Sequence, residues 1–334
     1  MVIALNKKRI RNKNEHKRTP LKVDKITLNK TARDRARGLS GQIAWPTILL
    51  GVLVIPAYWS IPYLVVFKDL SLWFAIPLMV LLTYAAYTVL HESVHGLING
   101  SHKNLKWLNE GMGYLAGTVL MATLTAHRPE HLSHHGNTNH GDRDPDNYAI
   151  QIVGSLREIL GSVWDAIAVQ YREYMENHWN KASAATNLTL VTEVLIGIGL
   201  RVLPFVLIFS TNNPEIESGW WRLLILFAVS GFIGIYVLVY LFAYIVHRPH
   251  TEKGRYKDTS TIIVPGPLSK IVTFFWGFQN YHSIHHLFPS VPFYRYRQLF
   301  SNIAEIMDVM EAPVYRLTSR GLIKTKAVEE REYR

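Results

Sequence analysis

The chain has 334 residues, of which 49% are hydrophobic and 18% charged, and its formal net charge is +11 at pH 7. It contains no cysteine, which excludes a disulfide framework, an iron–sulfur cluster and a cysteine-ligated zinc site. No nucleic-acid-binding motif follows the basic N-terminal run, so we do not expect a nucleic-acid partner.

Residues 1–43 carry most of the excess positive charge, with 13 Lys and Arg against three acidic residues. The segment lacks the apolar core of a signal peptide, so we interpret it as a basic cytoplasmic tail. Three roles remain open for it: a solvated tail, an anchor for anionic lipid headgroups, or a docking surface for an acidic redox partner. We expect a membrane domain to follow over residues 44–312 and a C-terminal cytoplasmic tail over residues 313–334.

Four apolar runs are long enough to cross a bilayer, which needs about 20 residues. They cover residues 44–67, 71–90, 188–210 and 221–246. The positive-inside rule places the basic tail in the cytoplasm. Four crossings then return both termini, and residues 91–187 and 247–334, to the cytoplasmic side. The predicted fold class is all-α: an integral membrane protein with four transmembrane helices in two hairpins and a cytoplasmic helical cap.

Three features between these runs add detail. The run 111–126 is too short to span and is predicted to be a re-entrant or buried helix. Residues 149–171 repeat apolar side chains at helical spacing, which predicts one amphipathic helix. Glu193 and Arg201 interrupt the third run and are expected to face the protein interior or to pair with each other.

Histidine is the most informative residue type, because 11 of the 15 histidines fall into four groups in the predicted cytoplasmic part. Within a group the spacing is i, i+3 or i+4, which places the imidazoles on one helix face. The groups are His91 and His95 in HESVH; His127, His131, His134 and His135 in HRPEHLSHH; His247 and His250 in HRPH; and His282, His285 and His286 in HSIHH.

Clustered neutral imidazoles indicate a transition-metal site. One ion cannot use eight or more histidines, so we expect two ions. The predicted ligands are His91, His95, His131, His134, His135, His247, His282, His285 and His286, and the secondary candidates are His127 and His250.

Polar residues next to the histidines are candidates to orient the ligands through the second ring nitrogen. In HHGNTNHGDRDPD they are Asn137, Asn139, Asp142, Asp144 and Asp146, although the same run could be a capping turn. Glu92 in HESVH is either a similar acceptor or a solvated residue.

Two other functional classes fit parts of this pattern. HESVH matches the HExxH motif of zinc proteases and HRPEH matches its inverted form, but a protease would leave both HxxHH groups unused. A metal transporter would place its site near the bilayer midplane, whereas these groups begin where the apolar runs end.

HxxxH, HxxHH and HxxHH, distributed over two membrane hairpins, resemble the integral-membrane fatty acid desaturase and hydroxylase superfamily over about residues 44–312. The resemblance implies a cytoplasmic non-heme di-iron centre that uses O2 as co-substrate and two external electrons. YIVHRPHTEKGRYKD and GFQNYHSIHHLFPSVPFYRY are similar to the carotenoid β-ring hydroxylases of the desaturase-like type, and the carotenoid ketolases share the HRP and DPD elements.

This resemblance implies O2-dependent oxidation of a membrane lipid, with conversion of β-carotene to a zeaxanthin-type product as the first expectation. Fatty acyl desaturation and carotenoid ketolation are the alternatives. The chain carries no flavin or nicotinamide fingerprint and no haem-binding motif, so a separate electron donor is expected, namely an acidic ferredoxin with its reductase.

Overall fold

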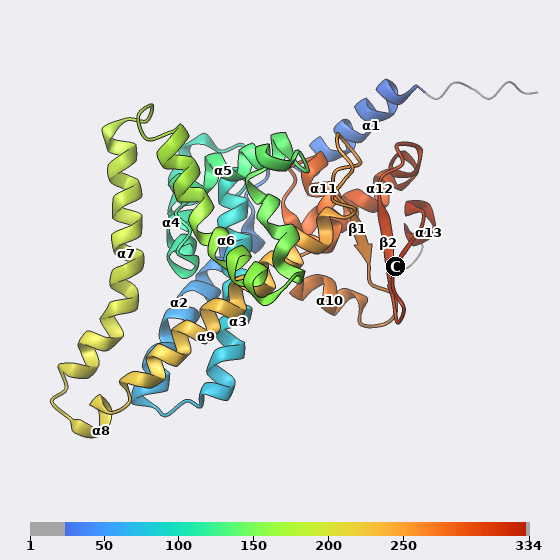
Figure 1. Cartoon of the computed structure of the whole chain (residues 1–334). Coiled ribbons are helices and arrows are strands. Elements are labelled where there is room, and N and C mark those ends of the chain that lie inside the picture. The colour runs from blue at the N-terminus through green and yellow to red at the C-terminus, as the bar shows by residue number, and fades with distance from the viewer. Residues whose placement is uncertain (1–23, 332–334) are drawn as a thin grey trace, which may run out of the picture.

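A computed structural model describes residues 24–331, and these form a mostly helical membrane protein (Figure 1). The first 23 residues of the predicted basic tail lie outside the described residues. The α-helices are α1 (Lys25–Arg37), α2 (Trp45–Phe67), α3 (Leu72–Val94), α4 (Lys106–Leu120), α5 (Leu124–Asn137), α6 (Leu156–Asn177), α7 (Ala184–Phe209), α8 (Pro214–Glu217), α9 (Trp220–Leu238), α10 (Ser269–Phe275), α11 (His282–Leu287), α12 (Tyr296–Val309) and α13 (Ala327–Arg331).

The prediction of four membrane-spanning helices is confirmed. They are Trp45–Phe67, Leu72–Val94, Ala184–Phe209 and the longer unit Pro214–His247, which continues α9 through a π-helical segment, Val239–Tyr244, into a 3-10 turn, Ile245–His247. The second of these helices ends four residues beyond the predicted run, so His91 lies inside it and His95 caps it. The histidine groups therefore start on rigid helical backbone.

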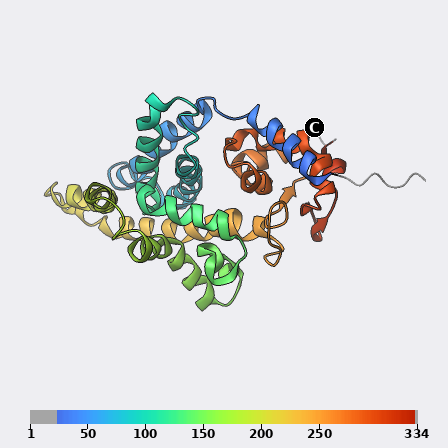
Figure 2. The same cartoon turned by 90° about the horizontal axis from the view of Figure 1, so that it is seen from above.

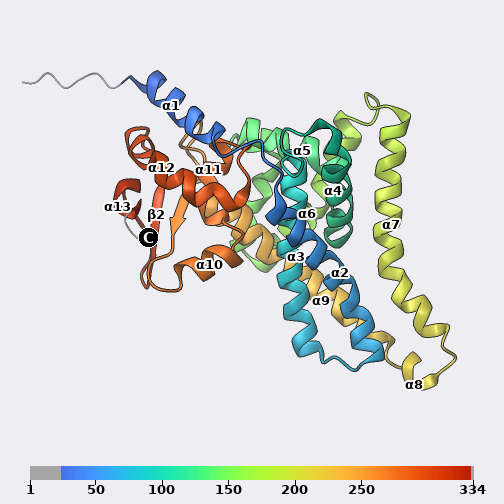
Figure 3. The same cartoon turned by 180° about the vertical axis from the view of Figure 1, so that it is seen from behind.

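Helices α2, α3 and α9 pack against one another and form the centre of the membrane part (Figures 1 and 3). Small residues allow this close approach: a Cβ at Gly234 of α9 would lie only 3.2 Å from the Thr83 side chain of α3. Helix α7 stands to one side, and only 17% of its most apolar stretch is buried in the protein. Most of its surface is therefore available to lipid.

The run 111–126 is not one helix: residues 111–120 form the end of α4, residues 121–123 form a turn, and residues 124–126 begin α5. Met121 adopts a left-handed conformation (φ 54°), and α5 begins three residues later. Arg201 of α7 donates to the carbonyls of Thr118 and Val119, both at 2.8 Å, while Glu193 accepts from the backbone nitrogen of Leu124 at 2.6 Å. Both charged residues face the interior, as expected, and each binds the backbone of this turn.

The single amphipathic helix predicted over residues 149–171 was wrong. A 3-10 helix, Pro145–Val153, ends at Gly154, and α6 begins at Leu156. Ser155 and Glu158 form a capping box there, each binding the other's backbone nitrogen, and this stabilises a new helix start.

A small sheet was not predicted. Strand β1 (Thr261–Ile263) pairs in parallel with β2 (Val314–Thr318), which pairs antiparallel with β3 (Gly321–Lys324). Figure 2 shows α1 lying along the C-terminal elements, where Ala32 and Ala36 of α1 are buried. The sheet ties residues 314–324 to β1, whose Thr261 hydroxyl lies 2.6 Å from the Ser283 hydroxyl of α11, and thus supports the last histidine box.

Candidate metal centre

The nine predicted ligands gather at one place, although they come from four segments of the chain. Helix α3 contributes two histidines, α5 contributes three, the 3-10 turn after α9 contributes one, and α11 contributes three. Six of these side chains are buried, and three are partly exposed: His95, His135 and His286. The ring nitrogens form two groups.

The first group brings together five histidines whose nearest ring nitrogens all lie within 4.8 Å of one another: His91, His95, His131, His135 and His285. Their Nε2 atoms converge. The Nε2–Nε2 distance is 3.0 Å between His91 and His285, 2.9 Å between His135 and His285, and 3.1 Å between His95 and His131.

The second group contains His134, His247 and His286. The Nε2 atoms of His134 and His247 are 3.0 Å apart. His282 extends this group, because its Nε2 atom lies 3.1 Å from Nε2 of His286.

Hydrogen bonds at the opposite ring nitrogen determine the tautomers in the second group. The Nδ1 atom of His134 is 2.7 Å from the Asp144 carboxylate, and Nδ1 of His247 contacts the Ala243 carbonyl oxygen. Carboxylate and carbonyl oxygens only accept, so both Nδ1 atoms carry a proton, and in the neutral rings both Nε2 atoms carry a lone pair. Two such lone pairs 3.0 Å apart suit two ligands of one bound cation.

The other two histidines of the second group, His282 and His286, also have an acceptor at Nδ1. His282 donates from Nδ1 to the Gln279 side-chain oxygen at 2.9 Å. Nδ1 of His286 is 3.4 Å from the Thr138 hydroxyl, which donates its own proton to the His134 carbonyl and is left as an acceptor. All four Nε2 atoms are therefore free to coordinate a metal, and the donor set fits a transition-metal ion.

Burial favours the neutral ligand form in most of these imidazoles. It lowers the pKa of His135 and of His282 well below the usual value, with further lowering by neighbouring histidines. His134 differs. Burial acts to lower its pKa, but the carboxylates of Asp146, Asp144 and Glu130 outweigh that effect and raise it to about 9. The same negative potential favours a bound metal cation at Nε2.

Among the predicted orienting residues, Asp144 has the clearest position. Besides His134, its carboxylate accepts from the backbone nitrogens of Asn139 at 2.8 Å and Asp146 at 3.0 Å. It therefore holds a ligand and also starts the following 3-10 helix. The Asp146 carboxylate lies 3.7 Å from Nδ1 of His134. Asp142 is exposed.

The remaining polar candidates bind backbone groups. Asn137 donates to the Ser133 carbonyl at 2.9 Å, and the Asn139 side chain donates to the carbonyls of Glu252 and Asp258, both at 2.8 Å. These bonds shape the loops around the histidines.

Glu92 is fully buried and accepts from the Thr47 hydroxyl and from the backbone nitrogen of Phe293. Its carboxylate thus links α3 to α2 and to the loop before α12.

The two secondary candidates lie beside the nine histidines but in neither metal group. His127 uses both ring nitrogens, with Nδ1 2.8 Å from Glu130 and Nε2 3.3 Å from the Tyr87 hydroxyl. His250 stacks on Tyr244 with ring centroids 4.9 Å apart.

Sequence reasoning missed several partners of the ligands. The Tyr296 hydroxyl lies 2.9 Å from Nδ1 of His285, and Gln279 and Thr138 bind His282 and His286 as described above. Gln279 precedes His282 by three residues, and this helical spacing could have identified it. Tyr296 lies 11 residues beyond His285, so only the tertiary fold reveals that contact.

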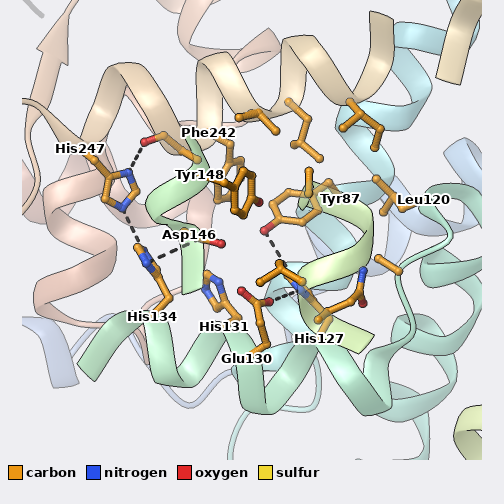
Figure 4. Close-up of a pocket in the computed structure, with 18 of the residues that line it drawn as sticks. Tyr87, Leu120, His127, Glu130, His131, His134, Asp146, Tyr148, Phe242 and His247 are labelled. Carbon is orange, nitrogen blue, oxygen red and sulfur yellow. Dashed lines mark hydrogen bonds and ion pairs between the residues drawn. The ribbon is translucent and has the colours of Figure 1, made fainter. Parts of the chain in front are cut away.

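A small cavity of about 40 Å³ opens directly beside the centre (Figure 4). Among its lining residues are four of the predicted ligands, His131, His134, His247 and His282. Its remaining wall is apolar along α6 and α9 and polar near α5. The polar residues are Tyr87, His127, Glu130, Asp146, Tyr148 and Gln170. Burial raises the pKa of Asp146 to about 8 and that of Glu130 to about 7.

A second, larger groove of about 470 Å³ lies on the other side of α3 and is lined almost entirely by apolar side chains of α2, α3 and residues 274–294. None of the nine histidines lines it. Gly277 and Thr88 are in close contact there, since a Cβ at Gly277 would lie 3.0 Å from the Thr88 hydroxyl oxygen. The cavity of Figure 4, and not this groove, reaches the predicted ligands.

Comparison with known proteins adds one finding. The family model described as "Fatty acid desaturase" matches residues 68–318, which is more than half of the chain and includes all four histidine groups. No curated protein matches the chain.

Proposed function

The chain belongs to the fatty acid desaturase family, and from that premise we propose that its nine clustered histidines hold two iron ions for the O2-dependent oxidation of a membrane lipid. Members of this family are oxidoreductases. The chain is therefore a membrane enzyme with desaturase or hydroxylase chemistry in the broad sense. Iron, the identity of the lipid and the electron donor are the parts that we propose.

The observation that carries this proposal is the direction of the imidazole protons. Three histidines donate hydrogen bonds from Nδ1 to Asp144, Ala243 and Gln279. Their Nε2 lone pairs therefore point toward the other ligands. Two groups of five and four histidines, without a cysteine, suit two ions with nitrogen ligands.

The zinc-protease alternative is not supported by the position of Glu92. A metalloprotease needs this glutamate at the metal as a general base. Here both carboxylate oxygens already accept hydrogen bonds, one from Thr47 and one from the Phe293 backbone.

When bound, the two irons would supply the reduction of O2 and an oxidant that can take hydrogen from an unactivated C–H bond, which no amino-acid side chain can do. The protein's own part is to hold the ligands, to exclude water from the buried cavity and to place the lipid there. Val169 of α6, Leu238 of α9 and Val239 of the π-helical segment form the apolar wall of this cavity, which must move outward to admit a lipid end, because the cavity holds only about 40 Å³.

We propose a carotenoid as the lipid and hydroxylation of its β-ring as the reaction. Two segments support this, YIVHRPHTEKGRYKD and GFQNYHSIHHLFPSVPFYRY, which are similar to those of carotenoid β-ring hydroxylases. Both segments contribute to the centre, through His247 and through His282, His285 and His286. Electrons would come from a ferredoxin and its reductase on the cytoplasmic side, where we place the centre and both termini.

Co-expression in bacteria that make β-carotene tests this proposal, with the ferredoxin and reductase supplied. We expect new, more polar pigments of the zeaxanthin type that require oxygen, and none with His285→Ala. Unchanged pigment with new double bonds in the membrane fatty acids would favour a fatty acyl desaturase instead. Keto pigments would favour a ketolase.

A further inference from the structure

Gln170 is a buried polar residue on an otherwise apolar part of α6. The residue is 1% exposed, and it lines the cavity beside the metal centre together with Ala166 and Val169 of the same helix. A buried amide that lacks a hydrogen-bond partner destabilises a protein, so a helix face that packs on apolar neighbours does not favour glutamine.

The orientation of this amide is determined by its backbone neighbour. The Gln170 side-chain nitrogen donates to the Ile167 carbonyl at 3.2 Å, and a flipped amide would place two oxygens against each other. The other end, Oε1, is buried and has no hydrogen-bond partner. The cavity wall therefore offers one acceptor that needs a donor from a molecule inside the cavity.

The surroundings of Gln170 are polar on the same wall. Oε2 of Glu130 binds His127, and the Glu130 carboxyl group also forms a hydrogen bond with that of Asp146. Figure 4 shows Glu130, Asp146, Tyr148 and Tyr87 facing the same space next to His131 and His134. Glu130 and Tyr87 have a protein partner in His127, and Asp146 has one in His134. A pure hydrocarbon, which has no donor, would leave Oε1 of Gln170 without a partner.

We propose that this polar wall, with Gln170 as its main acceptor, binds a hydroxyl group on the lipid end that lies at the metal centre. The inference rests on the proposed function and names the ligand class: a lipid alcohol whose O–H donates to Oε1 of Gln170. That alcohol has two sources, which are the product of hydroxylation and a substrate that already carries a hydroxyl group.

Equilibrium binding to the iron-loaded enzyme, without an electron donor so that no turnover occurs, tests the inference. The probes are two pairs that differ by hydroxyl groups: β-carotene with zeaxanthin, and octadecane with 1-octadecanol. Gln170→Met removes the acceptor at nearly constant volume, and Gln170→Glu keeps one. Ser162→Ala is the matched control, because Ser162 is another buried, unpartnered residue of α6 that does not line the cavity.

We expect Gln170→Met to weaken binding of the alcohols by about three- to ten-fold, the effect of one lost neutral hydrogen bond, while binding of the hydrocarbons is unchanged. Gln170→Glu and Ser162→Ala should bind both members of each pair as the wild type does. Iron content, measured on every variant, establishes that the centre is intact. Equal binding of the alcohols by wild type and Gln170→Met would overturn the inference, since Gln170 would then contact only water.

The two probe pairs separate this inference from the proposed function. If neither carotenoid binds but 1-octadecanol shows the Gln170 effect, the hydroxyl site stands and the carotenoid proposal fails. Turnover assays then distinguish the two sources of the alcohol. An alcohol that only inhibits is a product, and one that is oxidised further is a substrate.

Discussion

Asp144 connects the second group of histidines to the loop that follows α5. Its carboxylate is the acceptor that keeps the His134 proton on Nδ1. We predict that Asp144→Asn lowers metal affinity about 10- to 100-fold, because an amide oxygen is a weaker hydrogen-bond acceptor than a carboxylate and supplies no negative charge. Iron retained against a competing chelator measures the change.

The control for this prediction is Asp142→Asn, which removes a carboxylate from an exposed position of the same loop. It should retain iron like the wild type. Equal iron affinity in Asp144→Asn and wild type would mean that the Asp144–His134 bond does not support the metal.

His247 and His250 provide a second test at the level of single residues. Only His247 belongs to a group of converging nitrogens, whereas His250 stacks on Tyr244. We therefore expect His247→Ala to lose about one of the two irons and its activity, since the second group has few ligands to spare. His250→Ala should keep both ions. If metal analysis instead finds that His250→Ala loses iron and His247→Ala keeps both ions, His250 is the ligand.

Among the helices, α7 helps to position three ligands, because its Glu193 binds the turn from which α5 starts. Glu193 accepts from the backbone nitrogens of Leu124 and Thr125, which start the helix that carries His131, His134 and His135. We predict that Glu193→Ala lowers the free energy of unfolding by about 1–3 kcal/mol, because buried backbone donors lose their partner. Denaturation in detergent measures this difference.

A second readout separates positioning from general stability. If Glu193 holds α5 in place, iron content should fall in Glu193→Ala under conditions in which the protein remains folded. Glu215→Ala, in the exposed loop helix α8, should change neither property. Full iron content in folded Glu193→Ala would show that α5 keeps its place without this bond.

For the whole molecule, the centre joins four segments that are far apart in the chain: α3, α5, the turn at His247, and α11. Metal binding to such a site contributes to folding stability. We predict that a chelator lowers the thermal midpoint of the purified protein and that added iron restores it. His91→Ala should show a smaller shift, whereas His102→Ala, an exposed histidine outside the groups, should behave as the wild type.

Restoration by zinc alone, together with one tightly held zinc per chain, would contradict the iron assignment. A midpoint that does not depend on chelation would show that the helices hold the nine histidines together without a metal.

The membrane orientation is a further prediction for the whole chain. With four spans and a basic N-terminal tail, reporters fused after Arg18 and Arg334 should report the cytoplasm, and one after Asn212 the opposite side. An external signal at Arg334, or a cytoplasmic one at Asn212, would contradict the four-span topology.

The sequence by itself determined the features that depend on local chemistry. Long apolar runs predicted the four membrane helices, because about 20 consecutive apolar residues suffice to span a bilayer and this property does not depend on the rest of the chain. Spacing within HESVH, HRPEHLSHH and HSIHH predicted which histidines share a helix face, since helical periodicity is also local. The break at Gly154 was missed because the apolar pattern continues across it, although the backbone does not.

Only the tertiary structure decided how these local elements combine. It grouped His134 with His247 and His286, chose His247 over His250 for that group, and placed Gln170 in the wall of the same cavity. It also gave Glu193 and Arg201 backbone partners in a turn about 70 to 80 residues earlier in the chain. Such contacts depend on the packing of distant helices and on the direction of each side chain, and neither leaves a periodic signal in the sequence.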